Sequence, residues 1–100
     1  MKHRIASVNQ IPKGEGKPFT VNGKPIAVFN ADGKFYALLN ICAHQKFEID
    51  GGPLDGCVVT CPYHGAQYDV RNGKNLSPPA TGPIQTFKVI VEGNDLFIEM

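Results

Sequence analysis

Two short motifs, each with one cysteine and one histidine, constrain this 100-residue chain more than any other feature. The first is a Cys-x-His pattern at Cys42 and His44, and sixteen residues later a Cys-x-x-His pattern follows at Cys61 and His64. Thiolate sulfur and imidazole nitrogen are ligands that suit zinc and iron–sulfur centres. Because the two members of each motif are close in sequence, they can share one tight loop. The sequence therefore predicts two metal-binding loops.

The order of these residues distinguishes between the two kinds of centre. A zinc finger usually presents its cysteines as one pair and its histidines as another, whereas each motif here holds one residue of each kind. A [2Fe–2S] cluster with two different irons suits this arrangement, because both loops can send their cysteine to one iron and their histidine to the other. The pattern favours such a cluster, and a Cys2His2 zinc site is the alternative.

At these four residues the chain resembles the Rieske family, whose pattern is Cys-x-His, a spacer and Cys-x-x-His. Gly52, Leu54 and Gly56 match small and apolar residues of the family's first cluster loop, and Gly65 continues the second loop. The resemblance implies one [2Fe–2S] cluster held by Cys42, His44, Cys61 and His64. Tyr68 matches a family tyrosine that donates a hydrogen bond to a ligand sulfur, and an ordinary strand residue with its hydroxyl in water is the alternative.

Two features of high-potential respiratory members of the family are missing. Those proteins have two further cysteines in the cluster loops, which form a disulfide, where this chain has Phe47 and Tyr63. They also have a serine that donates to a cluster sulfur where this chain has Ala66. Hydrogen bonds to cluster sulfurs stabilise the more negative reduced state and raise the reduction potential. The resemblance therefore implies a potential in the lower part of the Rieske range.

The rest of the chain consists of short apolar runs separated by turns, without a helical period of useful length. Asn-Gly pairs at residues 22–23 and 72–73 are typical of hairpin turns. We expect an all-β fold, with a small antiparallel sandwich or barrel as its base and an inserted cluster-binding subdomain.

All 100 residues are expected to form a single Rieske domain. Its base subdomain would comprise residues 1–41 and 77–100, and its cluster-binding subdomain residues 42–76. The proline-rich segment 77–83 resembles the loop that covers the cluster in the family, and a simple extended connector is the alternative.

Composition argues against several other functions. A net charge of +1 is far from the basic excess of nucleic-acid-binding proteins. No stretch is long and apolar enough to span a membrane, and no leader pattern follows the N-terminus, so we expect a cytoplasmic protein. The third cysteine, Cys57, lies in an apolar run and is expected to be a buried, inert thiol.

Binding a cluster is compatible with an electron carrier, an oxygenase, a reductase subunit or a structural module. A Rieske oxygenase also needs an iron held by two histidines and a carboxylate, and only His3 remains after the cluster ligands. The chain has no glycine-rich fingerprint for NAD or flavin, so we expect an electron-transfer protein and not an enzyme.

With these properties the chain resembles a soluble Rieske-type ferredoxin. The resemblance implies transient docking, through the cluster loops, to a flavoprotein or other reductase and to a terminal oxygenase or reductase. The alternatives are the small Rieske-like subunit of a nitrite reductase and a zinc-stabilised interaction module.

Overall fold

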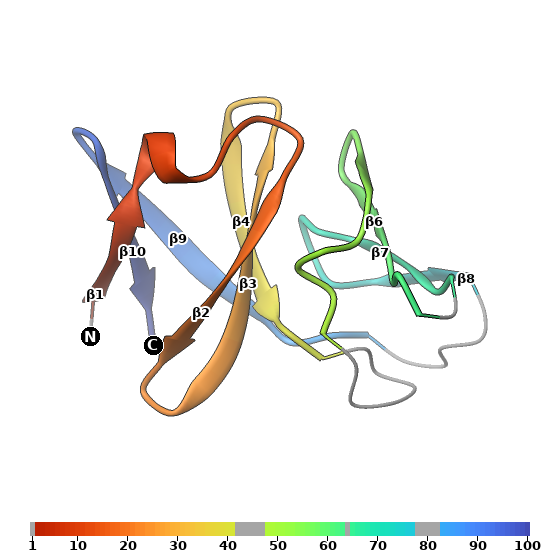
Figure 1. Cartoon of the computed structure of the whole chain (residues 1–100). Helices are drawn as coiled ribbons and strands as arrows, with labels where there is room; N and C mark the ends of the chain where they lie inside the picture. The colour runs from red at the N-terminus through yellow and green to blue at the C-terminus, as the bar shows by residue number, and fades with distance from the viewer. Residues whose placement is uncertain (1, 42–47, 64, 78–82) are drawn as a thin grey trace.

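The computed structural model describes residues 2–41, 48–63, 65–77 and 83–100. They form two antiparallel sheets, a six-stranded one in the order β1-β10-β9-β4-β3-β2 and a four-stranded one in the order β5-β6-β7-β8 (Figure 1). The strands of the larger sheet are β1 (Lys2–Ser7), β2 (Gly16–Val21), β3 (Lys24–Ala31), β4 (Lys34–Leu39), β9 (Thr86–Glu92) and β10 (Asp95–Glu99). Those of the smaller sheet are β5 (Leu54–Asp55), β6 (Val58–Thr60), β7 (Gln67–Asp69) and β8 (Asn75–Ser77). A short 3-10 helix, η1 (Val8–Gln10), follows β1.

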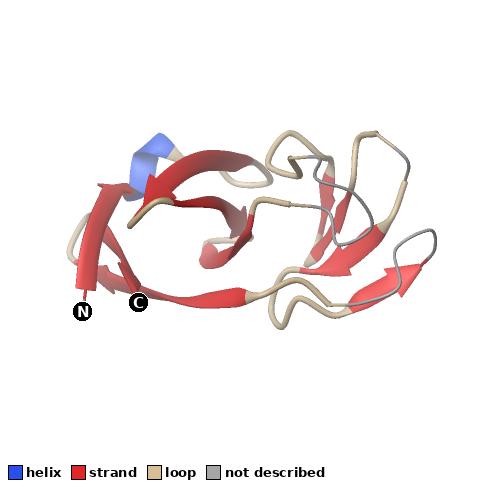
Figure 2. Ribbon diagram, turned by 90° about the horizontal axis from the view of Figure 1, so that it is seen from below, coloured by secondary structure: helices blue, strands red, loops and turns tan. Residues whose placement is uncertain are grey.

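The larger sheet curls into a nearly closed barrel. Its edge strands β1 and β2 approach each other, and in Figure 2 its strands surround a common interior at the end that carries both termini. The smaller sheet lies at the other end and is built from residues between β4 and β9. The expected all-β fold, a barrel base with an inserted unit, is therefore confirmed. The exact subdomain boundaries stay a prediction, and Ser77 lies in β8 of the smaller sheet.

Strand β3 separates two groups of apolar side chains and is buried on both faces. Ile26 and Val28 pack into the interior of the barrel, whereas Ala27 and Phe29 pack against residues of the smaller sheet. Successive side chains of a strand point to opposite faces, so the unbroken burial of residues 26–31 requires a packed layer on each side. Each large side chain that is fully buried here contributes about 1.5–3 kcal/mol of hydrophobic stabilisation. This shared wall holds the smaller sheet against the barrel.

The two Asn-Gly pairs form turns by different geometries. Asn22 and Gly23 both have positive φ, at 54° and 80°, as a two-residue turn of type I′ requires. At residues 72–73 only Gly73 has a positive φ, at 75°. A Cβ atom on Gly73 would lie 2.0 Å from the carbonyl oxygen of Ile84. The second turn therefore packs directly against the segment that leads into β9.

Candidate metal centre

The second predicted ligand motif lies at the tip of the β6–β7 hairpin. The Cys61 N–H donates to the Ala66 carbonyl at 2.7 Å, and the Gly65 N–H donates to the Cys61 carbonyl at 3.0 Å. These bonds close a tight loop over residues 61–66, and the positive φ of Gly65, at 79°, allows the reversal. His64 belongs to this loop by sequence but lies outside the described residues.

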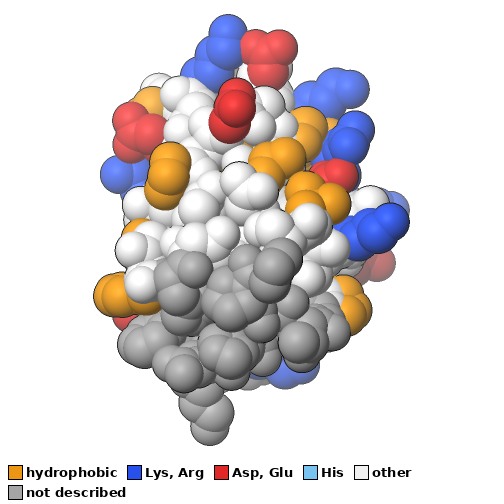
Figure 3. Space-filling view, turned by 90° about the vertical axis from the view of Figure 1, so that its right-hand side faces the viewer, with side chains coloured by type: hydrophobic (Ala, Val, Ile, Leu, Met, Phe, Trp, Pro, Cys, Tyr) orange, Lys and Arg blue, Asp and Glu red, His pale blue; other side chains and the backbone are white. Residues whose placement is uncertain are grey.

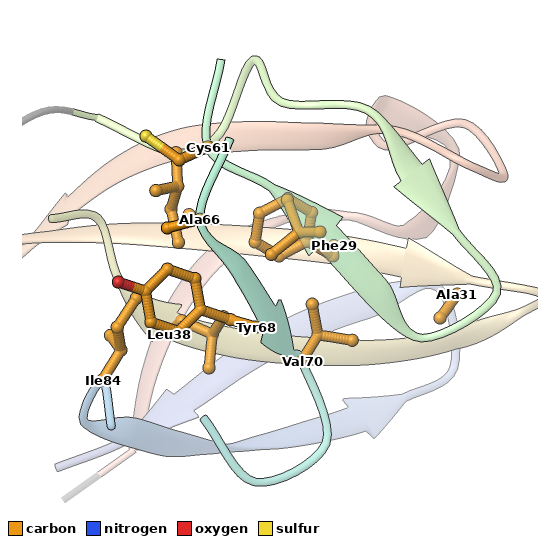
Figure 4. Packing of buried hydrophobic residues seen from close by; sticks show 11 residues of the cluster. Phe29, Ala31, Leu38, Cys61, Ala66, Tyr68, Val70 and Ile84 are labelled. Atoms are coloured by element: carbon orange, nitrogen blue, oxygen red, sulfur yellow. The ribbon is translucent and has the colours of Figure 1, made fainter. Parts of the chain in front are cut away.

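Cys61 is part of the apolar group that joins the smaller sheet to β3 and β4, and only 1% of it is exposed. The buried members of this group are Ala27, Phe29, Ala31, Leu38, Ile49, Val59, Cys61, Ala66, Tyr68, Val70 and Ile84. In Figure 4 the sulfur of Cys61 and the hydroxyl of Tyr68 point to the same side of this group, away from Val70. The hydrophobic wall behind Cys61 would exclude water from one side of a bound metal group.

Tyr68 is fully buried, with 0% of its surface exposed. The alternative in which its hydroxyl lies in water is therefore wrong. Tyr68 pairs with Val59 across the β6–β7 ladder, and this register places its ring beside the hairpin tip that carries Cys61. Its predicted hydrogen bond to a ligand sulfur stays a prediction.

The first predicted ligand loop is tied together at Asn40, a residue that sequence reasoning missed. Asn40 is only 2% exposed. Its Oδ1 accepts hydrogen bonds from the N–H groups of Ile49 at 2.7 Å and Asp50 at 3.0 Å. Because Asn40 precedes Cys42 and His44 in the sequence and residues 49–50 follow them, these bonds close the part of the first loop that includes both predicted ligands. Cys42 and His44 lie outside the described residues. An asparagine at a strand end could have signalled this role, since its side chain readily pairs with nearby backbone.

The two loops approach each other at a glycine. A Cβ atom on Gly52 would lie 2.0 Å from the carbonyl oxygen of Thr60, the residue before Cys61. The Thr60 N–H donates to the Pro53 carbonyl at 3.0 Å, and the Gly52 N–H to the Ile49 carbonyl at 3.0 Å. The end of the first loop is therefore held directly against the strand that leads into the second.

A hollow of about 230 Å³ opens between the loops. Glu48, Asp50 and Gly51 line it on one side, and Pro62 and Tyr63 on the other. Tyr63 is 63% exposed, although it follows Cys61 by only two residues. Thus one face of the loop pair is packed into the protein and the other faces solvent.

The turn after β7 is fixed by an ion pair between Asp69 and Arg71. The Asp69 carboxylate accepts hydrogen bonds from the Arg71 side chain at 3.0 and 2.8 Å and from the Arg71 N–H at 2.9 Å. The side-chain hydrogen bond from Arg71 holds the pKa of Asp69 below its ordinary value. Gly73 N–H donates to the Asp69 carbonyl at 2.7 Å, and Ile84 N–H donates to the Gly73 carbonyl at 2.8 Å. The turn is thereby joined to the segment that enters β9.

The third cysteine differs from its prediction. Cys57 is partly exposed, and it packs at the margin of the apolar group and not inside it. It immediately precedes β6, whose Val59 takes the fully buried position instead. Cys57 and Val59 are two positions apart and share one face of the chain, so both contact the same apolar group, but only Val59 lies within β6.

The described residues fit a [2Fe–2S] cluster held between two loops. Cys61 supplies a buried sulfur at a rigid tip, and the close contact at Gly52 brings the second loop to the first. In a [2Fe–2S] cluster of this kind, cysteine sulfurs bind one iron and histidine nitrogens bind the other. The part of the chain that the structure describes has no group of three His, Cys, Asp or Glu residues that could hold a metal. Since three predicted ligands lie outside that part, the complete set remains a prediction.

Comparison with known proteins decides the family. The family model of the Rieske [2Fe–2S] domain matches residues 1–88. The chain belongs to the Rieske [2Fe–2S] family. The biphenyl dioxygenase ferredoxin subunit of Pseudomonas sp. (strain KKS102) is 35% identical over 97 residues, which cover 96% of this chain and 89% of that protein.

Two solved structures agree with this assignment. The ferredoxin of carbazole 1,9a-dioxygenase from Nocardioides aromaticivorans IC177 superposes with a TM-score of 0.94 at 27% identity, covering 98% of this chain and 96% of the other. A complex of reduced oxygenase and oxidized ferredoxin in carbazole 1,9a-dioxygenase contains a chain with a TM-score of 0.91 at 28% identity, covering 97% and 91%.

These relatives confirm the resemblance to Rieske-type ferredoxins. Membership of the family confirms one [2Fe–2S] cluster, so the zinc-stabilised module is set aside. The relatives are ferredoxin subunits of oxygenase systems, which confirms that this Rieske protein transfers electrons and is not itself the enzyme.

Proposed function

We propose that this Rieske protein carries single electrons from a flavoprotein or other reductase to a terminal oxygenase or similar enzyme. The observation that carries the proposal is that the two ligand loops pack together at one end of the molecule. The described interior of the rest is occupied by apolar side chains. The dioxygenase ferredoxin subunits and the ferredoxin–oxygenase complex support the same role.

The proposed ligands are Cys42 and Cys61 for one iron and His44 and His64 for the other. When bound, the cluster supplies reversible one-electron transfer. The chain's residues orient the loops and exclude water from the inner side, where Cys61 and Tyr68 are buried.

The test is direct. Purified protein should contain two irons per chain, and reduction with dithionite should give an electron paramagnetic resonance (EPR) spectrum of the Rieske type. The reduced protein should then be oxidised by a terminal oxygenase and regenerated by a reductase with NADH. A colourless protein with bound zinc would overturn the proposal.

The loop end of the molecule is the proposed docking face. Viewed from this end, the surface around the undescribed residues is largely free of charged side chains, and most charges lie towards the rim (Figure 3). Rim charges mainly set the rate of encounter and its salt dependence. Transient docking would therefore place the loops against the partner while the surrounding charges guide its approach.

Exposed Glu48 beside the loops offers a test of this face. Glu48→Lys is expected to slow transfer to the partner by roughly tenfold at low ionic strength and less at high salt. Glu99→Lys is the matched control, since exposed Glu99 lies in β10 at the opposite end and the change in net charge is the same. Stopped-flow oxidation of the reduced protein measures both. Slower transfer in Glu99→Lys alone would place the docking face elsewhere.

We predict a midpoint potential in the lower part of the Rieske range, which runs from about −150 to +300 mV. The reason is the missing serine and disulfide of the high-potential members. Ala66→Ser should raise the potential, because Ala66 is fully buried in the second loop and a hydroxyl there could donate to a cluster sulfur. Protein-film voltammetry near neutral pH measures both values. A midpoint well above about 0 mV would contradict the prediction.

Tyr68→Phe should lower the same potential if the buried hydroxyl donates to a ligand sulfur. Tyr36→Phe is its control, because Tyr36 packs against the same apolar group from β4 without belonging to a ligand loop. Equal midpoint potentials in the wild type, Tyr68→Phe and Tyr36→Phe would show that Tyr68 donates no hydrogen bond to a ligand sulfur.

Within the described residues, no helix is long and apolar enough to cross a membrane. We include a cytoplasmic location in the proposal. Cys57 is in no disulfide, which agrees with a reducing compartment. Cell fractionation tests the location.

A further inference from the structure

The side chain of Asn40 uses both of its polar atoms inside the protein. Besides the two bonds that Oδ1 accepts from Ile49 and Asp50, its Nδ2 donates to Asp50 Oδ1 at 2.9 Å. Nδ2 also lies 3.5 Å from Glu48 Oε2. A buried amide is costly unless it is paired, so the bonds to Ile49 and Asp50 hold Asn40 and residues 49–50 in one arrangement.

Asn40 is itself fixed to the barrel. Its N–H donates to the Pro25 carbonyl at 2.9 Å, and the preceding Leu39 N–H donates to the Gln85 carbonyl at 2.8 Å. The residues on both sides of Cys42 and His44 in the sequence are thus attached, through one side chain, to the barrel.

The same contacts continue to the second ligand loop. Ile49 accepts the Gly52 N–H, and Gly52 packs without a side chain against the Thr60 carbonyl. Thr60 precedes Cys61, whose N–H closes the second loop. A displacement of residues 49–50 would therefore be transmitted to the base of both loops.

We propose that Asn40 is a positioning residue that sets the geometry of the two cluster-binding loops. Its hydrogen bonds hold the base of the loops together. The loops have no disulfide to do this, because Phe47 and Tyr63 stand where the high-potential members have cysteines. The inference rests on the proposed ligand set. Asn40 need not touch the cluster; it acts through the backbone that carries the ligands.

Asn30 provides a matched control. It is also a buried asparagine, 8% exposed, and its side chain also joins two backbone segments. Its Nδ2 donates to the Ile11 carbonyl at 2.9 Å, and its Oδ1 accepts from the Gly33 N–H at 2.8 Å. These segments belong to the barrel base and carry no predicted ligand.

The experiment compares the reconstituted wild type, Asn40→Ala and Asn30→Ala. Both variants should lose thermal stability, because each leaves buried backbone groups unpaired. Only Asn40→Ala should shift the EPR spectrum and the midpoint potential. It should also lose its cluster to a chelator roughly tenfold faster, in line with other residues that support metal ligands.

Asn40→Asp provides a second variant in case Asn40→Ala does not fold. It keeps an oxygen that can accept the Ile49 and Asp50 N–H groups, but it places a second carboxylate oxygen against Asp50 Oδ1, so its spectrum and potential should also shift from the wild-type values. If Asn40→Ala fails to fold, Asn40→Asp should still differ from Asn30→Ala, because it lacks the donor to Asp50.

One result would overturn the inference. An Asn40 variant would be destabilised at least as much as Asn30→Ala but would keep the wild-type EPR spectrum, midpoint potential and rate of cluster loss. Asn40 would then have a purely structural role. Absence of a Rieske spectrum from the wild type would instead overturn the proposed function, and the inference with it. The two failures are therefore distinguishable.

Discussion

Replacement of His64 by alanine is expected to abolish the Rieske EPR signal of the purified, reduced protein, and His44→Ala should do the same. Each change removes one of two proposed nitrogen ligands from the same iron, and the donor set then no longer suits this cluster. The visible absorbance of the oxidised protein and its iron content should fall with the signal. The effect is a loss of nearly all correctly assembled cluster and not a graded change.

The chain contains its own controls for this experiment. His3, which lies in β1 of the barrel, is the one histidine of the sequence that is not a proposed ligand, and Cys57 is the one such cysteine. His3→Ala and Cys57→Ser should keep the wild-type signal, whereas Cys61→Ser should lose it with the histidine variants. A normal spectrum in His64→Ala would end the assignment of the ligands.

Gly52→Ala is expected to produce the largest loss of stability among single additions of a methyl group in the cluster loops. The new Cβ would lie 2.0 Å from the Thr60 carbonyl oxygen, so the backbone of one loop must move. Overpacking of this kind costs about 3 kcal/mol, which corresponds to a fall in melting temperature of roughly 15 °C for a domain of this size. Differential scanning calorimetry measures the change.

Gly51→Ala is the matched control for Gly52→Ala. Nothing lies within 4 Å of a Cβ atom at Gly51, and its φ is not in the left-handed region. Its stability should stay within about 0.5 kcal/mol of the wild type. Similar melting temperatures for the two variants would show that the loops do not meet as closely as the contact at Thr60 implies.

The chemistry of the centre and the class of fold are readable from sequence because both depend on short-range patterns. The Cys-x-His and Cys-x-x-His spacings place two donors on one loop regardless of what surrounds it. The turn at Asn22 and Gly23 is equally local, since it depends on residues that accept positive φ. These features predicted the Rieske cluster and the all-β fold that the family match and the structure confirm.

The burial of individual residues was decided by segments that are far apart in the chain. Tyr68 is fully buried and Cys57 partly exposed because the smaller sheet packs on the outer face of β3. Neither residue's own surroundings in the sequence specify that contact. The apolar run of β3 is compatible with one buried face or two, and only the packed arrangement distinguishes them.

The support of the ligand loops also depends on tertiary structure. The Asn40 side chain reaches residues nine and ten positions away, and the glycine at position 52 is required by the carbonyl of Thr60. From sequence, Asn40 is a polar residue after a strand and Gly52 one of two adjacent glycines. Their roles arise because a buried amide must find partners and because two backbones meet without room for a side chain, and both conditions exist only in the folded chain.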